Sequence, residues 1–201
     1  LNRYDGYRFV VYAYNSEDAG SLPASTITAL YADQDGMIWV GTEEGGLYRF
    51  DSSTETFTPF RHDPDNSASL SSDGITDIFE DREHVLWIGT KRGLNALDRL
   101  TGRITRYVAG EDDTHLQSDG ILKIYQDRAG TLWFGTNGGL HVIDPVTGRI
   151  THYPVGPGEV QDILEDRDGQ LWIAAGLTGL FTFDRVNQRF ARYGGPGDRR
   201  G

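Results

Sequence analysis

The strongest constraint on the fold is a five-residue phrase that the chain repeats four times. It reads IWVGT, LWIGT, LWFGT and LWIAA, and it contains all four tryptophans of the sequence, which are separated by 48, 46 and 39 residues. Self-similarity at a period of about 40 to 50 residues is typical of the four-stranded blades of a β-propeller. The repeat therefore predicts a propeller before any other feature is considered.

Each repeat, aligned on its tryptophan, predicts four strands. An apolar or alternating segment comes first, and a tight turn rich in Asp and Gly leads to the tryptophan strand. A short loop ending in Gly precedes a third strand such as GLYRFD, and a second turn leads to an outer strand such as RITRY. Four strands joined by short hairpins form an antiparallel sheet. The predicted fold class is all-β, a β-propeller of four-stranded antiparallel blades.

The register of the repeats predicts an open arc. The start of the chain aligns with the second half of a repeat, so we expect a half blade followed by four blades. The predicted partial propeller spans 1–193, and a Gly- and Arg-rich tail follows at 194–201. The half blade is 1–14, and the blades are about 26–60, 75–107, 120–153 and 159–193. Unpaired strand edges seek partners, so we expect the remaining blades of a parent propeller, or a homodimer through exposed blade edges.

The tryptophan strands are expected to pack blade against blade. Side chains alternate along a strand, so Trp87 and Gly89 share one face, and the glycine leaves room for a neighbouring chain. A structural role for the tryptophans is favoured over ligand stacking, although Ala174 replaces the glycine in the fourth repeat. The predicted packing residues are Trp39, Trp87, Trp133, Trp172, Gly41, Gly89 and Gly135.

Composition excludes several classes of partner. The formal net charge of −11 disfavours nucleic acid, because binding phosphates requires clustered Lys and Arg. The absence of cysteine excludes disulfides and thiolate metal sites. The apolar runs are shorter than a membrane span, and no signal peptide begins the sequence, so no membrane contact by this segment is expected.

The repeat unit resembles the two-component regulator propeller repeat, most clearly in HDPDNSASLSSDGI and EDREHVLWIGT. This resemblance implies the extracytoplasmic or periplasmic sensor region of a bacterial hybrid two-component receptor. Two seven-bladed propellers, a β-sandwich, a membrane helix and a kinase or cyclase generally make up such receptors. It also implies an oligosaccharide as the sensed ligand. Function is thus expected to be non-enzymatic ligand sensing or protein docking.

Polar loop residues are the candidate ligand-binding groups. Propellers bind ligands where the inter-blade connections and the second-to-third-strand loops meet around the channel. The candidates, for which solvated loops are the competing interpretation, are Arg61, His62, Lys91, Arg92, His115 and Asn137.

A second candidate set lies on the innermost strands. Asp77, Lys123 and Asp162 occupy equivalent positions in successive repeats, so the lysine has an acidic residue in the repeat before it and in the repeat after it. They are expected to face the channel as a polar ladder. Mutual charge neutralisation and the binding of an ion or polar ligand both remain open.

No catalytic residue, metal site or cofactor is predicted. The D-x-D-G turns at Asp33 and Asp166 lack the later ligands of a calcium loop, and turn formation explains them better. The histidines have no H-x-H or H-E-x-x-H spacing. Two alternatives stay open: a lyase-type propeller enzyme that uses a metal with His and Glu on the channel face, and a purely structural scaffold.

Overall fold

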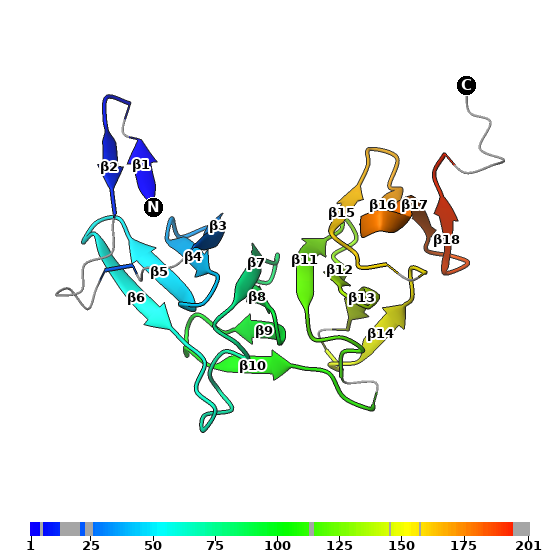
Figure 1. The fold of residues 1–201 in the computed structure, drawn as a ribbon, viewed down its shortest axis with the longest axis horizontal. Coiled ribbons are helices and arrows are strands. Elements are labelled where there is room, and N and C mark those ends of the chain that lie inside the picture. The colour runs from blue at the N-terminus through cyan, green and yellow to red at the C-terminus, as the bar shows by residue number, and fades with distance from the viewer. Residues whose placement is uncertain are drawn as a thin grey trace.

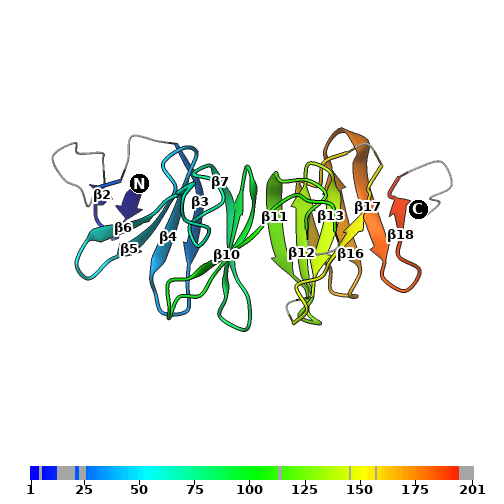
Figure 2. The ribbon, with the colours of Figure 1, turned by 90° about the horizontal axis from the view of Figure 1, so that it is seen from below.

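The strands form a curved row of antiparallel sheets. The computed structural model describes residues 1–4, 6–12, 21–22, 26–112, 115–144, 146–156 and 158–194. In this part of the chain, eighteen strands build four four-stranded sheets and one two-stranded sheet. The sheets stand side by side (Figures 1 and 2), and Figure 1 shows them in an arc with the first strand of each blade on the inner side. The predicted all-β fold, an open arc of four blades plus a half blade, is confirmed.

Strand order within each sheet follows the chain, and all pairs are antiparallel. The half blade has β1 (Asn2–Tyr4) and β2 (Phe9–Val11); blade 1 has β3 (Ile27–Ala32), β4 (Ile38–Thr42), β5 (Leu47–Asp51) and β6 (Thr56–Phe60). Blade 2 has β7 (Ile75–Glu80), β8 (Leu86–Thr90), β9 (Gly93–Leu97) and β10 (Ile104–Tyr107). Blade 3 has β11 (Ile121–Gln126), β12 (Leu132–Thr136), β13 (Gly139–Ile143) and β14 (Ile150–Tyr153). Blade 4 has β15 (Asp162–Glu165), β16 (Leu171–Ala175), the 3-10 turn η1 (Gly176–Thr178), β17 (Gly179–Asp184) and β18 (Arg189–Arg192).

Parts of the segments inferred from the sequence have no described structure. Residues 13–14 of the predicted half blade and 195–201 of the predicted tail lie outside the described residues. Within the described residues, no helix has the length and hydrophobicity that a bilayer span needs.

Each interior interface forms around a glycine of the tryptophan strand. A Cβ atom on Gly41 would lie 2.6 Å from Cγ2 of Ile75 in the next blade, and one on Gly89 would lie 2.8 Å from Cγ2 of Ile121. On Gly135 it would meet the carbonyl oxygen of Val160. The next blade therefore fills the space that a side chain would take, which is why the strand requires glycine.

Three of the four tryptophans lie in the same interfaces, each against the following blade. Trp39, Trp87 and Trp133 are buried in hydrophobic clusters whose other members come mainly from the next sheet. Trp172 is only half-buried, and its ring contacts Tyr193 at 5.0 Å between centroids. Beside it, Leu164 is 58% exposed at the position where Phe79 and Tyr125 pack against a following blade.

A hydrogen bond repeated in all four blades fixes each tryptophan. The indole Nε1–H donates to the aspartate six residues earlier, at 2.6 to 2.9 Å. The other carboxylate oxygen of Asp81 accepts the amides of Glu83 and Val85, at 3.0 and 2.9 Å, so one side chain closes the hairpin and holds the ring. The pairs are Asp33 with Trp39, Asp81 with Trp87, Asp127 with Trp133 and Asp166 with Trp172.

In blade 4 these contacts also lower the pKa of the aspartate, Asp166. The Trp172 indole and the amides of Gln170 and Asp168 donate to Asp166 and hold the pKa of its carboxyl below the usual value. Asp166 therefore stays ionised, as an acceptor of several N–H groups must.

We predict that Gly135→Ala lowers the free energy of unfolding by about 1 to 3 kcal/mol, because the new methyl group overlaps backbone that cannot move aside. Ala174→Gly is the matched control, since no described blade covers that strand position, and it should cost about 1 kcal/mol or less. Urea denaturation of both variants measures the difference. Equal effects would contradict the assignment of Gly135 to a tight interface.

Asp81→Ala should lower the free energy of unfolding by about 3 kcal/mol, because it leaves a buried indole N–H and two turn amides without an acceptor. Asp81→Asn keeps one carbonyl oxygen and should lose roughly half as much. Urea denaturation followed by tryptophan fluorescence reports both. A cost for Asp81→Ala below that of Asp81→Asn would show that the carboxylate does not hold the ring.

Candidate functional site

The candidate binding residues inferred from the sequence lie on connections at one end of the blades. Lys91 and Arg92 are exposed between β8 and β9, and Asn137 is exposed between β12 and β13. The Lys91 ammonium is 3.4 Å from Oε1 of Glu43, so it bridges blades 2 and 1. We call the surface of these connections and of 61–74 and 108–120 the loop face.

Arg61 and His62 begin the connection from blade 1 to blade 2. The Arg61 guanidinium donates to the Tyr48 hydroxyl at 2.7 Å and lies 6.0 Å from the centroid of its ring. The His62 ring is bonded through Nδ1 to the carbonyl oxygen of Leu70, at 2.6 Å. His115 lies in the next connection, where its ring is paired with Asp112. The structure thus divides the six candidates among several connections.

The connection 61–74 is held in a defined shape. Leu70 is buried at its base, and Arg106 on the outer strand β10 donates to the carbonyl oxygens of Ser69 and Asn66 at 2.6 and 2.8 Å. Asp73 accepts the amide of His62 at 2.7 Å. A loop tied at both ends and in the middle presents Arg61 and His62 from fixed positions.

Two residues of the predicted ladder, Asp77 and Lys123, form an ion pair between the innermost strands of neighbouring blades. Lys123 Nζ is 3.3 Å from Oδ2 of Asp77, and the same oxygen accepts the amide of Ile124 at 2.8 Å. Asp77 thereby joins the innermost strands of blades 2 and 3. Asp162 accepts the amide of Ile163 at 2.9 Å, and no ion pair links it to Lys123 among the described residues. The contacts match the neutralising interpretation of Asp77 and Lys123.

A buried histidine supports the loop face of blade 3. His141 is fully buried, its ring is stacked on that of His152 at 4.5 Å, and its Nε2 accepts the amide of Gln117 at 3.4 Å. Burial, followed by repulsion from His152, lowers the pKa of His141 to about 4. In blade 2 the equivalent Asn95 accepts the amide of Ser71 at 2.9 Å.

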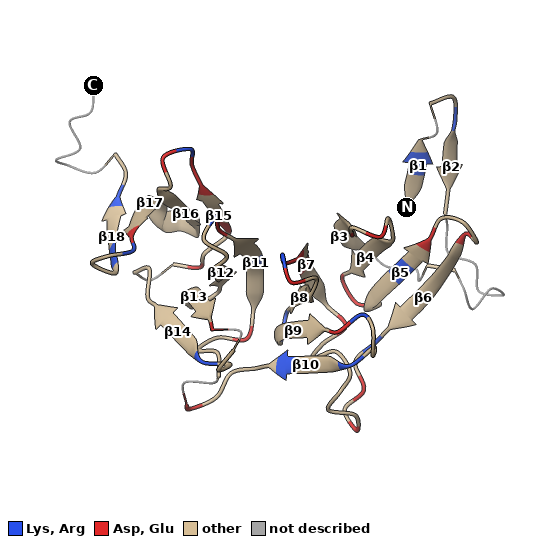
Figure 3. Cartoon of the chain, turned by 180° about the vertical axis from the view of Figure 1, so that it is seen from behind, with Lys and Arg blue, Asp and Glu red and all other residues tan. Residues whose placement is uncertain are grey.

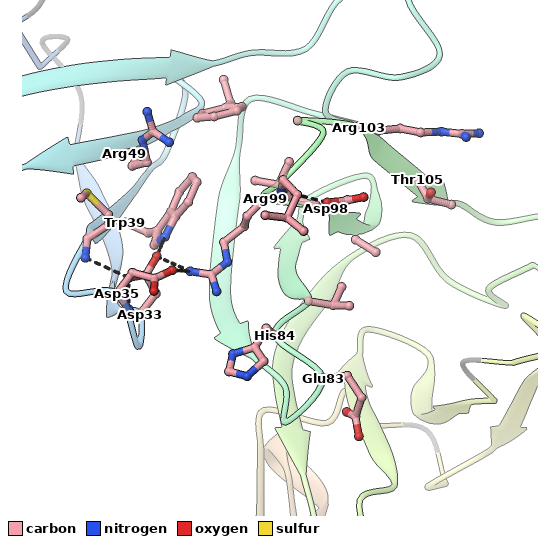
Figure 4. Close-up of a pocket in the computed structure, with 17 residues that line it drawn as sticks. Asp33, Asp35, Trp39, Arg49, Glu83, His84, Asp98, Arg99, Arg103 and Thr105 are labelled. Carbon is pink, nitrogen blue, oxygen red and sulfur yellow. Dashed lines mark hydrogen bonds and ion pairs between the residues drawn. The ribbon is translucent and has the colours of Figure 1, made fainter.

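A large cavity lies elsewhere, between blades 1 and 2. It has a volume of about 1130 Å³ and contains none of the six loop-face candidates. Figure 4 shows Trp39 and Arg49 on the blade 1 side, and Arg103 and Thr105 on the blade 2 side. We call this cavity the blade 1–2 cleft.

An arginine with three carboxylate partners occupies the hairpin end of the cleft. Arg99 lies 2.7 Å from Oδ2 of Asp33, 3.0 Å from Asp35 and 2.7 Å from Glu80. Burial alone would lower the pKa of Arg99, but the bond to Asp33 and the charges of Glu80 and Asp35 outweigh it and raise the pKa. These contacts pair the opposite charges and tie blade 2 to blade 1, while the buried Nε of Arg99 makes no hydrogen bond among the described residues.

Sequence reasoning missed the cleft, although two signals marked it. Arg49 stands where the following repeats have Ala96 and Val142. His84, on the rim of the cleft, has a left-handed backbone with φ of 63°, where the other three hairpins have glycine. Its ring is bonded to the buried Glu80 at 3.2 Å.

Charged groups concentrate in the turns and connections rather than on the sheet faces (Figure 3). Among the described residues, no group of three or more His, Asp or Glu side chains is arranged to hold a metal ion.

The sequence matches the profile of the two-component regulator propeller in four segments, 21–44, 69–92, 115–138 and 154–176. Comparison with curated proteins gives no match.

Among solved structures, the chain is similar to the extracellular domain of the hybrid two-component system BT3049 from B. thetaiotaomicron. The TM-score is 0.81 and the identity is 27%, over 95% of this chain and 27% of that domain. This chain therefore spans about a quarter of the length of that domain.

Two further likenesses extend to the fold alone. PorZ, a surface component of the type-IX secretion system of Porphyromonas gingivalis, gives a TM-score of 0.70 at 16% identity, over 96% of this chain and 31% of that one. Virginiamycin B lyase from Staphylococcus aureus gives a TM-score of 0.67 at 12% identity, over 87% of this chain and 57% of that one.

The burial of His141 predicts a loss of stability in acid. The unfolded chain takes up the proton below the ordinary histidine pKa of about 6.5, whereas the folded ring resists it until about pH 4. The free energy of unfolding should thus fall as pH drops through this window, by about 2 kcal/mol at pH 5 from this residue. His141→Asn, which copies Asn95, should flatten the dependence measured by urea denaturation across pH. Parallel curves for the variant and the parent would contradict it.

Proposed function

Because the chain is built from two-component regulator propeller repeats, we propose that it is a ligand-sensing or protein-docking segment of a bacterial signal-transduction receptor and acts without catalysis. The likeness to an extracellular domain of a hybrid two-component system, at 27% identity over 95% of this chain, is the observation that carries this proposal. The same likeness supports a position outside the cytoplasm, in the periplasm. The remaining blades of a larger propeller are its proposed immediate partners.

The proposed ligand is an oligosaccharide, bound on the loop face. The family resemblance supports the ligand class, and the side chains support the location. Arg61, fixed over the Tyr48 ring, lies beside His62, and Lys91 and Arg92 are exposed on a neighbouring loop. These groups donate hydrogen bonds of the kind that sugar hydroxyls and ring oxygens accept. The ordered connection 61–74 would let them bind with little loss of conformational freedom.

The two alternatives predict different behaviour. A lyase-type enzyme would need a free His and Glu pair on the channel side. His84 does contact Glu80, but on a hairpin where Arg99 and the Gln34 amide already engage that carboxylate. His141 and His152 lie on a third strand and an outer strand. Similarity to virginiamycin B lyase at 12% identity supports the shared fold and no more. A scaffold would bind no small ligand at all.

Titration calorimetry against a panel of neutral and acidic oligosaccharides tests the proposal. At least one should bind with a dissociation constant of about 1 mM or tighter, which is the range of weak specific ligands. The double variant Lys91→Ala/Arg92→Ala should weaken binding about tenfold, or about 1.4 kcal/mol. Arg167→Ala, an exposed arginine on the hairpin at the other end of blade 4, is the matched control and should not.

Silence across the whole panel would favour the scaffold. Turnover of any panel member that requires a divalent metal would favour the enzyme. Binding that both variants leave unchanged would remove the ligand from the loop face.

A further inference from the structure

The blade 1–2 cleft exists because this interface lacks the aromatic filling of the others. Blade 4 inserts Phe183 against Trp133 and Tyr153, at 5.5 and 4.9 Å between ring centroids, with Phe190 behind it. Blade 3 places Phe134 against Trp87 at 6.4 Å. In blade 2 the residues equivalent to Phe134, Phe183 and Phe190 are Ile88, Leu97 and Ile104. These side chains are aliphatic and shorter than phenylalanine. The wedge between the outer strands is consequently left open.

The cleft has the extent of a groove rather than of a compact pocket. Its lining begins at the hairpin residues Asp35 and His84 and continues to Arg49 and Thr105 on the strands β5 and β10. Its volume of about 1130 Å³ lies just above the range of small-molecule sites, which hold about 300 to 1,000 Å³. An elongated occupant fits this course along the blades.

The floor of the groove is apolar. Met37, Val85 and Leu97 line it together with Phe60, whose ring lies 5.5 Å from that of Trp39. Trp39 itself is 1% exposed, so its indole offers no open face for a sugar ring to stack on. The vacant wedge instead has the chemistry of a pocket for an apolar side chain.

The lining carries charges of both signs, and most of its carboxylates already have partners. Asp98 accepts the amides of Leu100 and Thr101, and Glu83 accepts the side-chain amide of Gln126 at 3.4 Å. The carboxylates of Asp33, Asp35 and Glu80 are already engaged by Arg99. Arg49 and Arg103 also line the cleft, and within the described part of the chain neither guanidinium makes a hydrogen bond or ion pair.

From these observations we propose that the blade 1–2 cleft binds an extended peptide segment that carries an apolar anchor side chain and flanking carboxylates. The anchor enters the wedge over Leu97, where blade 4 has its own Phe183. The carboxylates pair with Arg49 and Arg103 along the walls. The inference does not depend on the loop-face ligand, which lies on different connections.

Met37, the sole methionine of the sequence, lines the cleft and gives a single reporter. The protein labelled with methyl-¹³C methionine is titrated with three capped peptides in which Leu alternates with Glu, Lys or Ser. The Leu–Glu peptide should shift the Met37 methyl resonance saturably and the Leu–Lys peptide should not. Its affinity should fall as salt rises from about 0.05 to about 0.5 M, because the charge pairs are exposed.

Two variants separate the anchor from the charges. Leu97→Phe copies Phe183 and fills the wedge, and Arg49→Glu reverses one wall; each should weaken the Leu–Glu peptide at least about tenfold. Arg189→Glu, on the equivalent hairpin of blade 4 and away from the cleft, is the matched control and should bind as the parent does. If Leu97→Phe fails to fold, Arg49→Glu still decides the question. Because it reverses one charge of the cleft, this variant should bind the Leu–Lys peptide more tightly than the Leu–Glu peptide.

Equal binding of the Leu–Lys peptide, or undiminished binding by both folded variants, would overturn the proposal. So would the absence of any Met37 shift with all three peptides. The same titration is run with neutral oligosaccharides. A Met37 shift with these alone would overturn the peptide proposal and assign the cleft to sugars.

Discussion

A buried aspartate that binds both its own hairpin and an indole ring is the interaction on which this structure depends. In blade 2, one oxygen of Asp81 accepts two turn amides and the other accepts the Trp87 N–H at 2.6 Å. The ring is thereby held at the edge of its sheet, facing the next blade. Because the same arrangement occurs four times, each sheet presents a rigid apolar face to its successor, and the glycine beside it lets the two sheets meet.

Hydrogen bonds and ion pairs between neighbouring blades, which we call polar seams, reinforce these apolar faces. They differ from one interface to the next. Glu80, Gln126 and Glu165 each accept a backbone amide from the preceding blade, at 2.8 to 3.1 Å. Glu80 and Glu165 also pair with Arg99 and Arg185, which reach the buried aspartates Asp33 and Asp127 of the preceding blades. Blade 3 has the neutral Gln126 together with Pro145 at the arginine position, so acid and arginine are present or absent together. The repeat therefore keeps one skeleton while its seams vary, and the variation creates distinct surfaces such as the blade 1–2 cleft.

Sequence reasoning was strongest where the repeat itself carried the signal. The phrase around Trp39, Trp87, Trp133 and Trp172 predicted the four-stranded blades, because period and turn chemistry are local properties. The bond from each indole to the aspartate six residues earlier was missed, although the constant spacing was visible; the aspartates were interpreted as turn formers alone. The ladder of Asp77, Lys123 and Asp162 was placed by register, yet only the first two form an ion pair, since side-chain reach across an interface is not a property of register.

The sequence by itself determined the class of fold, the number of blades in this segment and the residues that alternate into its interfaces. Strand period, hairpin residues and the tryptophan repeat specify these locally, so they can be read without coordinates. Only the tertiary structure decided that a cleft opens between blades 1 and 2 beside the cluster of Trp39 and Leu97, and that Arg49 and Arg103 line it without a hydrogen bond or ion pair among the described residues. A cavity depends on the combined volumes of side chains from two sheets, and the spacing of residues along one chain does not record that sum.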